Sequence, residues 1–277
     1  MRRAIARAQT WWLWLFILAI PGSVVLGVPF PFDIALMAVP LLLCFVRPPS
    51  SALAPVELSP PVKGRWVVLN SPGSSVPSHG TRAHGQAFAV DLLPRSLDTS
   101  TPLRWFGRGR TPESYPCFGA PVLAMASGTV IRAHSTRRDH RARSTVSSIL
   151  WMMTAEGLLR ELMGTSGMLG NHVILRHDNG LFSAYAHLRK GSTTVGVGAH
   201  VAAGQQLGEL GNTGNSSEPH LHVQLMDRPH PSAAAGVPMH WPRAITDPSD
   251  RDPRWTSEPK PTAQQGFPAN GQVFDVA

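Results

Sequence analysis

Cysteine is scarce in this chain. Only Cys44 and Cys117 occur among its 277 residues. Cys44 lies in an apolar N-terminal stretch and Cys117 in the main body of the sequence, so a disulfide within one domain is excluded and cysteine usage leaves the redox compartment open. The sequence also contains no internal repeat, which excludes a repeat architecture.

Charged side chains are almost absent near the N-terminus. Between residues 11 and 46 the only one is Asp33, and the charges that precede this stretch are all basic: Arg2, Arg3 and Arg7. A long apolar stretch after a basic start is typical of a membrane segment. The sequence therefore predicts an N-terminal membrane anchor over residues 1–46.

The number of spans in this anchor stays open. Residues 11–28 are long enough for one span, whereas residues 34–46 are short and contain Pro40. The second segment could complete a hairpin, lie in the membrane interface or form a tilted second span. A cleaved signal peptide is the rival interpretation, but no convincing small-x-small cleavage site follows Pro21, so a retained anchor is favoured.

The rest of the chain divides by composition. Residues 47–64 are rich in proline and predict an extended linker. Residues 65–228 alternate short β-rich segments with glycine turns, which predicts an all-β domain. Its clearest hairpin turns at Asn179-Gly180, a pair that suits a type I′ turn. Residues 229–277 are rich in Pro, Asp and Arg and predict a mostly irregular extension, with a possible last edge strand over residues 271–276.

One segment of the domain lacks the β pattern. A basic run over residues 137–143 precedes residues 147–163, which are rich in Ile, Leu, Met and Trp without strand alternation. This composition predicts a helical insertion over about residues 135–168. The insertion could pack on the β domain, border a substrate groove or contact a membrane surface.

The richest chemistry lies in Glu218-Pro219-His220-Leu221-His222-Val223. Side chains at i and i+2 of a strand share a face, so His220 and His222 would point the same way. A His-x-His pair alone is weak evidence in a chain with 12 histidines. However, three upstream segments contain His79, Asp91 and His187, which could complete a site with this pair. Catalytic zinc usually has three His, Asp or Glu ligands and one open position.

These segments, in this order, resemble peptidase family M23, the lysostaphin-like or LytM-type zinc metalloendopeptidases. The resemblance runs from about Pro116 to Leu225, with the segment from His79 to Leu92 before it. It is carried by Ser78-His79-Gly80, Gly85-Gln86-Ala87-Phe88-Ala89-Val90-Asp91, Gly128-Thr129-Val130, Gly170-Asn171-His172-Val173, Tyr185-Ala186-His187-Leu188, Gly211-Asn212-Thr213-Gly214 and Pro219-His220-Leu221-His222. The family implies an antiparallel β-sandwich or barrel-like core.

The resemblance also implies roles for particular residues. His222 and Asp91 match zinc ligands, His220 matches the general base, and His187 matches the histidine that stabilises charge near the scissile carbonyl. The first ligand is less clear, because position 87, where most members carry a histidine, is alanine here. His79 is favoured for this position, with His84 as the alternative.

The implied function is zinc-dependent hydrolysis of peptide cross-links in bacterial peptidoglycan. A catalytically silent domain that activates another wall hydrolase is the alternative. The net charge of +8 suits anionic wall polymers or lipid head groups, and no nucleic-acid-binding motif accompanies the arginines. The substrate implies a bacterial cell membrane location with the domain on the extracytoplasmic side, although arginines flank both ends of the apolar segment. The sequence does not reveal the oligomeric state.

Overall fold

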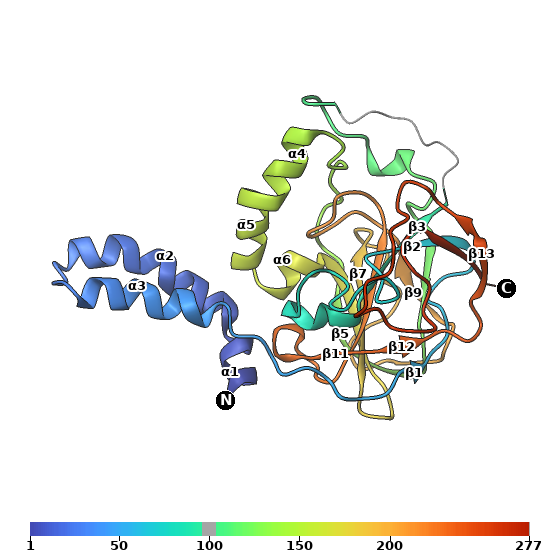
Figure 1. The fold of residues 1–277 in the computed structure, drawn as a ribbon, viewed down its shortest axis with the longest axis horizontal. Coiled ribbons are helices and arrows are strands. Elements are labelled where there is room, and N and C mark those ends of the chain that lie inside the picture. The colour runs from blue at the N-terminus through green and yellow to red at the C-terminus, as the bar shows by residue number, and fades with distance from the viewer. Residues whose placement is uncertain (96–103, 277) are drawn as a thin grey trace.

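A ten-stranded sheet forms the centre of the protein within the described residues, 1–95 and 104–276 of this computed structural model (Figure 1). Its strands are β2 (Gly64–Leu69), β3 (Val90–Pro94), β5 (Gly128–His134), β6 (Asn171–Arg176), β7 (Phe182–Leu188), β8 (His200–Val201), β10 (Leu221–Met226), β11 (Gly236–Val237), β13 (Ile245–Arg251) and β14 (Gln272–Val276). The order is β13-β14-β2-β3-β10-β7-β6-β5-β8, with β11 beside β10.

Among the described residues, two small sheets and three short 3₁₀ helices accompany the large sheet. β4 (Pro121–Leu123) pairs antiparallel with β9 (Gln206–Glu209), and β1 (Val56–Glu57) pairs parallel with β12 (Met239–His240). The 3₁₀ helices are η1 (Ala83–Phe88), η2 (Pro112–Ser114) and η4 (Pro231–Ala233). Every pairing in the large sheet is antiparallel. The predicted antiparallel β-rich core is therefore confirmed.

The apolar alternation of β10 determines which side chains face the core. Leu221, Val223 and Leu225 are at most 1% exposed and belong to the main hydrophobic cluster. Burying an aliphatic side chain of this size stabilises a fold by about 1.5–3 kcal/mol. Because side chains alternate along a strand, His222 and Gln224 point to the opposite face. The core packing thus holds the histidine away from the apolar interior.

The predicted hairpin exists but has a different turn. β6 pairs with β7 from Asn171↔Leu188 to Arg176↔Phe182. Gly180 has a positive φ, and Asn179 does not. Gly180 N–H donates to the His177 carbonyl, and His177 N–H donates to the Leu181 carbonyl. This is a three-residue hairpin loop, in which a type I turn ends in a left-handed glycine, and not the predicted type I′ turn.

Helices occupy the segment that lacks the β pattern. They are α4 (Val146–Trp151), the π-helical turn η3 (Met152–Glu156), α5 (Gly157–Leu162) and α6 (Thr165–Leu169). Thr145 begins α4 with a capping box, because its hydroxyl accepts from Ser148 N–H while Ser148 Oγ accepts from Thr145 N–H. That these helices form an insertion relative to other M23-like domains stays a prediction.

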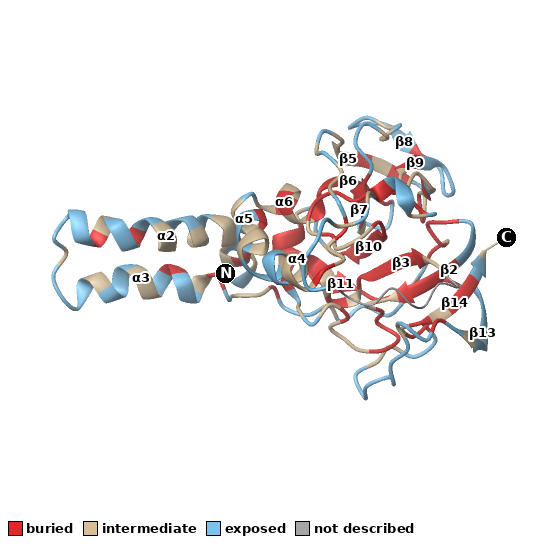
Figure 2. Ribbon diagram, turned by 90° about the horizontal axis from the view of Figure 1, so that it is seen from above, coloured by how far each residue is buried: buried red, intermediate tan, exposed pale blue. Residues whose placement is uncertain are grey.

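A hairpin of two apolar helices projects from the domain (Figures 1 and 2). It follows α1 (Arg2–Arg7) and consists of α2 (Gln9–Val25) and α3 (Phe32–Leu43). The predicted membrane-spanning helix over residues 11–28 is not found: no helix among the described residues is long and apolar enough to cross a membrane. The 17 residues of α2 rise about 26 Å, against a hydrocarbon thickness of about 30 Å.

The segments on either side of the predicted domain take part in its structure. In the proline-rich segment 47–64, Leu58 and Val62 are buried in the main cluster. In the C-terminal segment, β14 lies between β13 and β2 and buries Phe274 completely. The expected last strand therefore exists, but it is an interior strand of the sheet and not an edge.

Candidate metal centre and active site

Asp91 and His222 face each other across two paired strands. The register of β3 and β10 sets His222 opposite Asp91, and both are nearly fully buried. Nδ1 of His222 lies 2.9 Å from Oδ1 of Asp91. The hydrophobic pattern of β10 fixes this register, because a slip of one residue would turn His222 into the apolar core.

His79 joins this pair from the loop before η1. Its Nε2 lies 3.2 Å from each carboxylate oxygen of Asp91, and its ring packs edge-on against that of His222. One ligand atom from each of His79, Asp91 and His222 lies within 4.8 Å of the others. Two imidazole nitrogens and one carboxylate oxygen are a donor set that zinc accepts, with a fourth position left open.

Hydrogen bonds on the outer side of each ring determine which nitrogen is free. Ser78 Oγ donates to the Ala89 carbonyl at 2.7 Å and can therefore accept from Nδ1–H of His79 at 3.2 Å. Gln224 Nε2 donates to the His84 carbonyl, so its Oε1 accepts from Nε2–H of His222 at 2.9 Å. In its neutral form each ring would then carry its lone pair on the nitrogen that faces the site, the arrangement that metal binding requires. A proton on Nδ1 of His222 instead makes a hydrogen bond to Asp91; although burial lowers the pKa of His222, this hydrogen bond and the charge of Asp91 raise it.

The carboxylate of Asp91 is held ionised. Burial by itself raises its pKa, but the neighbouring imidazoles of His79 and His220 and the hydrogen bond with His222 lower the pKa well below its usual range. Asn70 adds a hydrogen bond of 2.8 Å from Nδ2 to Oδ2. An ionised, oriented carboxylate beside two imidazole nitrogens fits a divalent cation.

His220 and His187 lie beside the three potential ligands. Nε2 of His220 is 3.6 Å from Oδ1 of Asp91, and the rings of His187 and His220 have centroids 4.8 Å apart. Nδ1 of His220 donates to the Glu218 carbonyl at 2.8 Å, and Nδ1 of His187 donates to the Thr213 carbonyl at 2.7 Å. In the neutral form, each ring therefore keeps an unprotonated Nε2.

His187 has a specialised environment. Burial and the nearby His220 and His222 rings lower its pKa well below the ordinary value. Its backbone has φ +63°, a left-handed conformation that costs a non-glycine residue about 1 kcal/mol or more and often occurs at functional sites. The neutral ring can accept a proton at Nε2, and it can donate there only after it has taken one up.

The loop that orients these two histidines is itself supported by the basic segment 137–143. Asp139 accepts backbone N–H bonds from Asn212 (2.7 Å) and Lys190 (2.9 Å) through its two carboxylate oxygens. Asn212 accepts from Ser216 Oγ–H, and Ser216 lies 3.1 Å from Nδ1 of His220. The segment 137–143, which in the sequence resembles an exposed basic cluster, thus contains Asp139, which holds the backbone next to the site in place.

His84 lies outside this group. Its Nε2 is 2.9 Å from Glu161 of α5, and its Nδ1 is 3.2 Å from Ser232 Oγ. Only its backbone carbonyl approaches the site, through Gln224. The structure therefore brings together His79, Asp91, His187, His220 and His222 and leaves His84 aside. Whether His79 ligates zinc stays a proposal.

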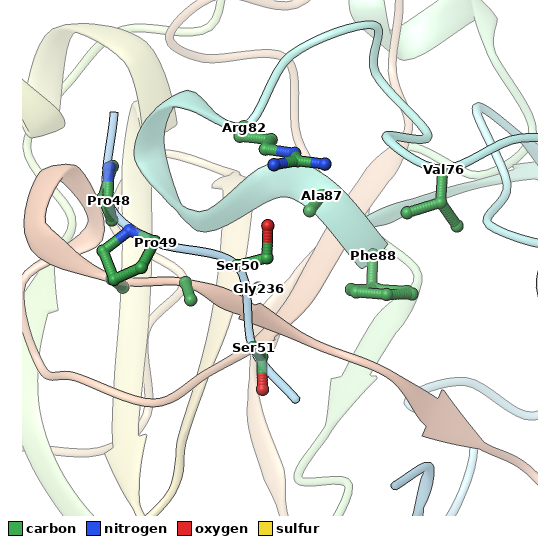
Figure 3. Close-up of a pocket in the computed structure, with 11 residues that line it drawn as sticks. Pro48, Pro49, Ser50, Ser51, Val76, Arg82, Ala87, Phe88 and Gly236 are labelled. Carbon is green, nitrogen blue, oxygen red and sulfur yellow. The ribbon is translucent and has the colours of Figure 1, made fainter. Parts of the chain in front are cut away.

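A cavity near η1 does not overlap the site. It lies between the proline-rich segment and η1 (Figure 3), and its lining comprises Pro48, Pro49, Ser50, Ser51, Val76, Arg82, Ala87, Phe88, Ala234, Ala235 and Gly236. None of the five clustered residues contributes to it. Ala87, the position where most members of the resembled family carry a histidine, faces this cavity with other small or apolar groups.

Sequence reasoning missed several residues that orient the site. They are Asn70, Ser78, Asp139, Thr213, Ser216 and Gln224. Gln224 carried a signal, because it shares the strand face of His220 and His222 at the next alternate position. Thr213 acts through a backbone carbonyl, and Asp139 lies more than seventy positions from Asn212, so neither has a local sequence signal.

Comparisons with known proteins agree with this geometry. Residues 152–234 match the model of peptidase family M23. The chain is 42% identical over 72 residues to the peptidoglycan DD-endopeptidase ShyA of Vibrio cholerae, a match covering 25% of this chain and 16% of that protein. It is 35% identical over 89 residues to the DD-carboxypeptidase/endopeptidase Mpg of Neisseria meningitidis, covering 32% and 20%. The chain thus spans a fifth or less of the length of these relatives.

Solved structures were also found to be similar. The catalytic domain of lysostaphin from Staphylococcus simulans is 25% identical, with a TM-score of 0.29, and the match covers 47% of this chain and 85% of that domain. The M23 metalloprotease pseudoalterin is 14% identical, with a TM-score of 0.38, over 81% and 96%. The matched family model and the sequence relatives confirm the resemblance seen in the sequence: residues 152–234 are similar to peptidase family M23.

Proposed function

We propose that the protein is a zinc-dependent endopeptidase that hydrolyses peptide cross-links of bacterial peptidoglycan. The observation that carries this proposal is the convergence of five residues from distant segments, in which three offer metal-ligand atoms within 4.8 Å of one another and two further histidines lie beside them. The names of two sequence relatives, a peptidoglycan DD-endopeptidase and a DD-carboxypeptidase/endopeptidase, support the substrate class.

His79, Asp91 and His222 would hold the metal. When bound, zinc would supply a Lewis acid that lowers the pKa of a coordinated water toward about 7. The outer partners Ser78 and Gln224 keep a lone pair of each imidazole directed at the site. Asn70 keeps the carboxylate of Asp91 oriented.

His220 and His187 would handle protons. Nε2 of His220 is free to accept a proton from the attacking water, and the protonated ring can then give it to the leaving amine. His187 would donate to the developing oxyanion. Because its Nδ1–H is committed to the Thr213 carbonyl, this role requires a second proton on Nε2, which His187 would take up from solvent. Its lowered pKa opposes this uptake, and the negative charge that develops on the oxyanion would favour it.

The decisive experiment uses purified full-length protein and isolated peptidoglycan. We expect new amino termini from cleaved cross-links in the presence of zinc, no new amino termini after chelation, and recovery when zinc is restored. A protein that binds zinc and peptidoglycan but releases no new amino termini would favour the alternative, a silent domain that activates another wall hydrolase.

The location of the domain follows from its proposed substrate. Cross-linked peptidoglycan lies outside the cytoplasmic membrane, so we propose an extracytoplasmic domain, and an anchor over residues 1–46 stays a prediction. Protease added to intact spheroplasts should remove the domain. Complete protection until the cells are lysed would contradict both the location and the wall-hydrolase assignment.

A further inference from the structure

The helices α4, η3 and α5 have their polarity reversed relative to a normal surface helix. A helix on a water-soluble domain buries its apolar stripe and exposes its charges. Here Glu156 faces inward, where it bonds Arg143 and Arg160, and Glu161 bonds His84. Apart from Thr154, whose hydroxyl donates to the Leu150 carbonyl, the exposed side chains are apolar and each at least 47% accessible: Leu150, Trp151, Met153, Leu158, Leu159 and Met163.

The segment 104–107, which precedes η2 in the chain and contacts the start of α4, extends this apolar surface. Backbone N–H groups of Val146 and Ser147 donate to the carbonyls of Arg104 and Trp105, which fixes the segment at the start of α4. Trp105 and Phe106 are 70% and 76% exposed. We use the name outer face for Trp105, Phe106, Leu150, Trp151, Met153, Leu158, Leu159 and Met163. Eight large apolar side chains exposed together mark an interaction surface.

The outer face adjoins the apolar helical hairpin. Thr10 Oγ1 donates to the Glu161 carbonyl, and Trp14 Nε1 donates to the Leu162 carbonyl, so α2 meets the end of α5. In Figure 1 the hairpin leaves the domain beside α5, and Figure 2 shows exposed or half-buried residues along most of both helices.

The exposure pattern of the hairpin indicates what kind of partner covers these apolar surfaces. Val24, Val25 and Leu26 are 80%, 82% and 76% exposed at consecutive positions. Consecutive residues of a helix point about 100° apart, so these three span about 200° around the helix axis, more than one face of a partner protein covers. A lipid phase surrounds a helix on all sides. The exposed Arg2 and Arg7 lie on α1, just before the hairpin, where they can meet anionic head groups.

We propose that the outer face lies flat on a phospholipid bilayer that the hairpin enters, so that the domain has a second, in-plane membrane contact. Tryptophan suits the boundary between head groups and acyl chains, and Trp105 and Trp151 would lie there. The inference requires only that the hairpin enters lipid, not that it crosses the bilayer, and it does not depend on the proposed peptidase activity.

The first test places a reporter on the outer face of the full-length protein. An environment-sensitive fluorophore is attached at Met153→Cys, with Val197→Cys, also an exposed apolar position, as the matched control; the native Cys44 and Cys117 are buried. With vesicles of phosphatidylethanolamine and phosphatidylglycerol, the emission at position 153 should shift to the blue and be quenched by brominated acyl chains. Position 197 should do neither. A bound protein whose position 153 label does not respond would overturn the proposal.

The second test removes the contact while the hairpin is kept. The double variant Leu158→Glu, Leu159→Glu should bind these vesicles about tenfold more weakly or worse, and Val197→Glu should bind like wild type. A circular dichroism spectrum and an unfolding midpoint like those of wild type show that the variant is folded. Unchanged vesicle affinity would refute the in-plane contact. A lipid-free dimer that the double variant abolishes would assign the outer face to a second copy of the chain and also overturn the proposal.

Discussion

Nε2 of His222 donates a hydrogen bond of 2.9 Å to Oε1 of Gln224, and Gln224 in turn donates to the His84 carbonyl at 2.7 Å. The amide of Gln224 therefore cannot flip without losing both bonds. In the neutral form of His222, this contact places the lone pair on Nδ1, the nitrogen that faces Asp91.

We predict that Gln224→Leu weakens zinc binding by about 10- to 100-fold, the usual effect of losing a partner that orients a ligand. Gln224→Glu should recover part of the affinity, because it still accepts from His222. Competition with a chromogenic chelator measures both, and Gln206→Leu, at an exposed glutamine, is the control. Equal zinc affinity in Gln224→Leu and wild type would mean that the contact has no role in metal binding.

Substitutions of His79 and His84, the two candidates for the first zinc ligand, should have different effects on zinc binding. His79→Ala should lose zinc, because it removes one of the three converging donors. His84→Ala should keep zinc but lower the free energy of unfolding by about 1–3 kcal/mol, since Glu161 and Ser232 lose a buried partner. Zinc content and denaturant unfolding report the two effects. Loss of zinc in His84→Ala alone would reassign the first ligand.

His220 and His222 should differ although they are two residues apart. His222→Ala should lose both zinc and activity. His220→Ala should keep zinc and lose about 10²- to 10⁴-fold in turnover, the usual contribution of a positioned general base. Metal analysis and cleavage of peptidoglycan fragments test the pair. A His220→Ala enzyme as active as wild type would remove His220 from the mechanism.

Asp139 should affect turnover without touching substrate or metal. Asp139→Ala removes the acceptor of Asn212 N–H, which holds the loop carrying Thr213 and Ser216, and the acceptor of Lys190 N–H after β7. We therefore expect about a tenfold loss in kcat, by analogy with other misplaced catalytic groups, at unchanged zinc affinity. Asp178→Ala, at an exposed position beside the β6–β7 turn, is the control. A normal kcat would show that the loop holds its position without Asp139.

Glu156 should make stability depend on acid pH. Burial opposes its ionisation, but hydrogen bonds from Arg143 and Arg160 lower its pKa to about 2, so its stabilising effect is complete above the ordinary value of 4.5 and is lost as pH falls toward 2. Glu156→Gln should cost about 1–2 kcal/mol at pH 7, discounted for solvent screening.

The measurement is urea unfolding of wild type and Glu156→Gln between pH 7 and pH 3. The difference between the two proteins should shrink below pH 4.5. Glu113→Gln, at an exposed glutamate, should show no such trend. A difference that is constant with pH would mean that the ion pairs of Glu156 contribute no net stability.

The sequence predicted what local patterns encode. Alternation along β10 fixes where His222 points, and motif order brought in His79, Asp91 and His187. Alternation along β7 does not place His187, because its left-handed backbone interrupts the pattern between Tyr185 and Leu188, which both enter the core. Contacts between distant segments were not predictable, because no local pattern says that Asp139 meets Asn212 or that β14 returns between β2 and β13. The turn at Asn179-Gly180 was wrong because the longer loop needs a positive φ only at the glycine.

The membrane span was misjudged for a different reason. Hydropathy over residues 11–28 reports the composition of the segment. It does not report the residue at which the helix ends. In the structure α2 ends at Val25 and the chain turns back into α3. For the helical segment 146–169, the sequence showed the apolar side chains but not the direction in which they point. They point outward because Glu156 and Glu161 have buried partners on the inner side of the helices.

The assembly of the site from β3, β7, β10 and the His79 loop links metal retention to the order of folding. Asp91 and His222 are 131 positions apart, so their meeting requires late, long-range closure of the sheet and cannot occur in a partly folded chain with only local contacts. Zinc bound there would stabilise only the fully closed sheet. The metal content of a sample would then be a direct measure of the fraction of molecules that have completed folding.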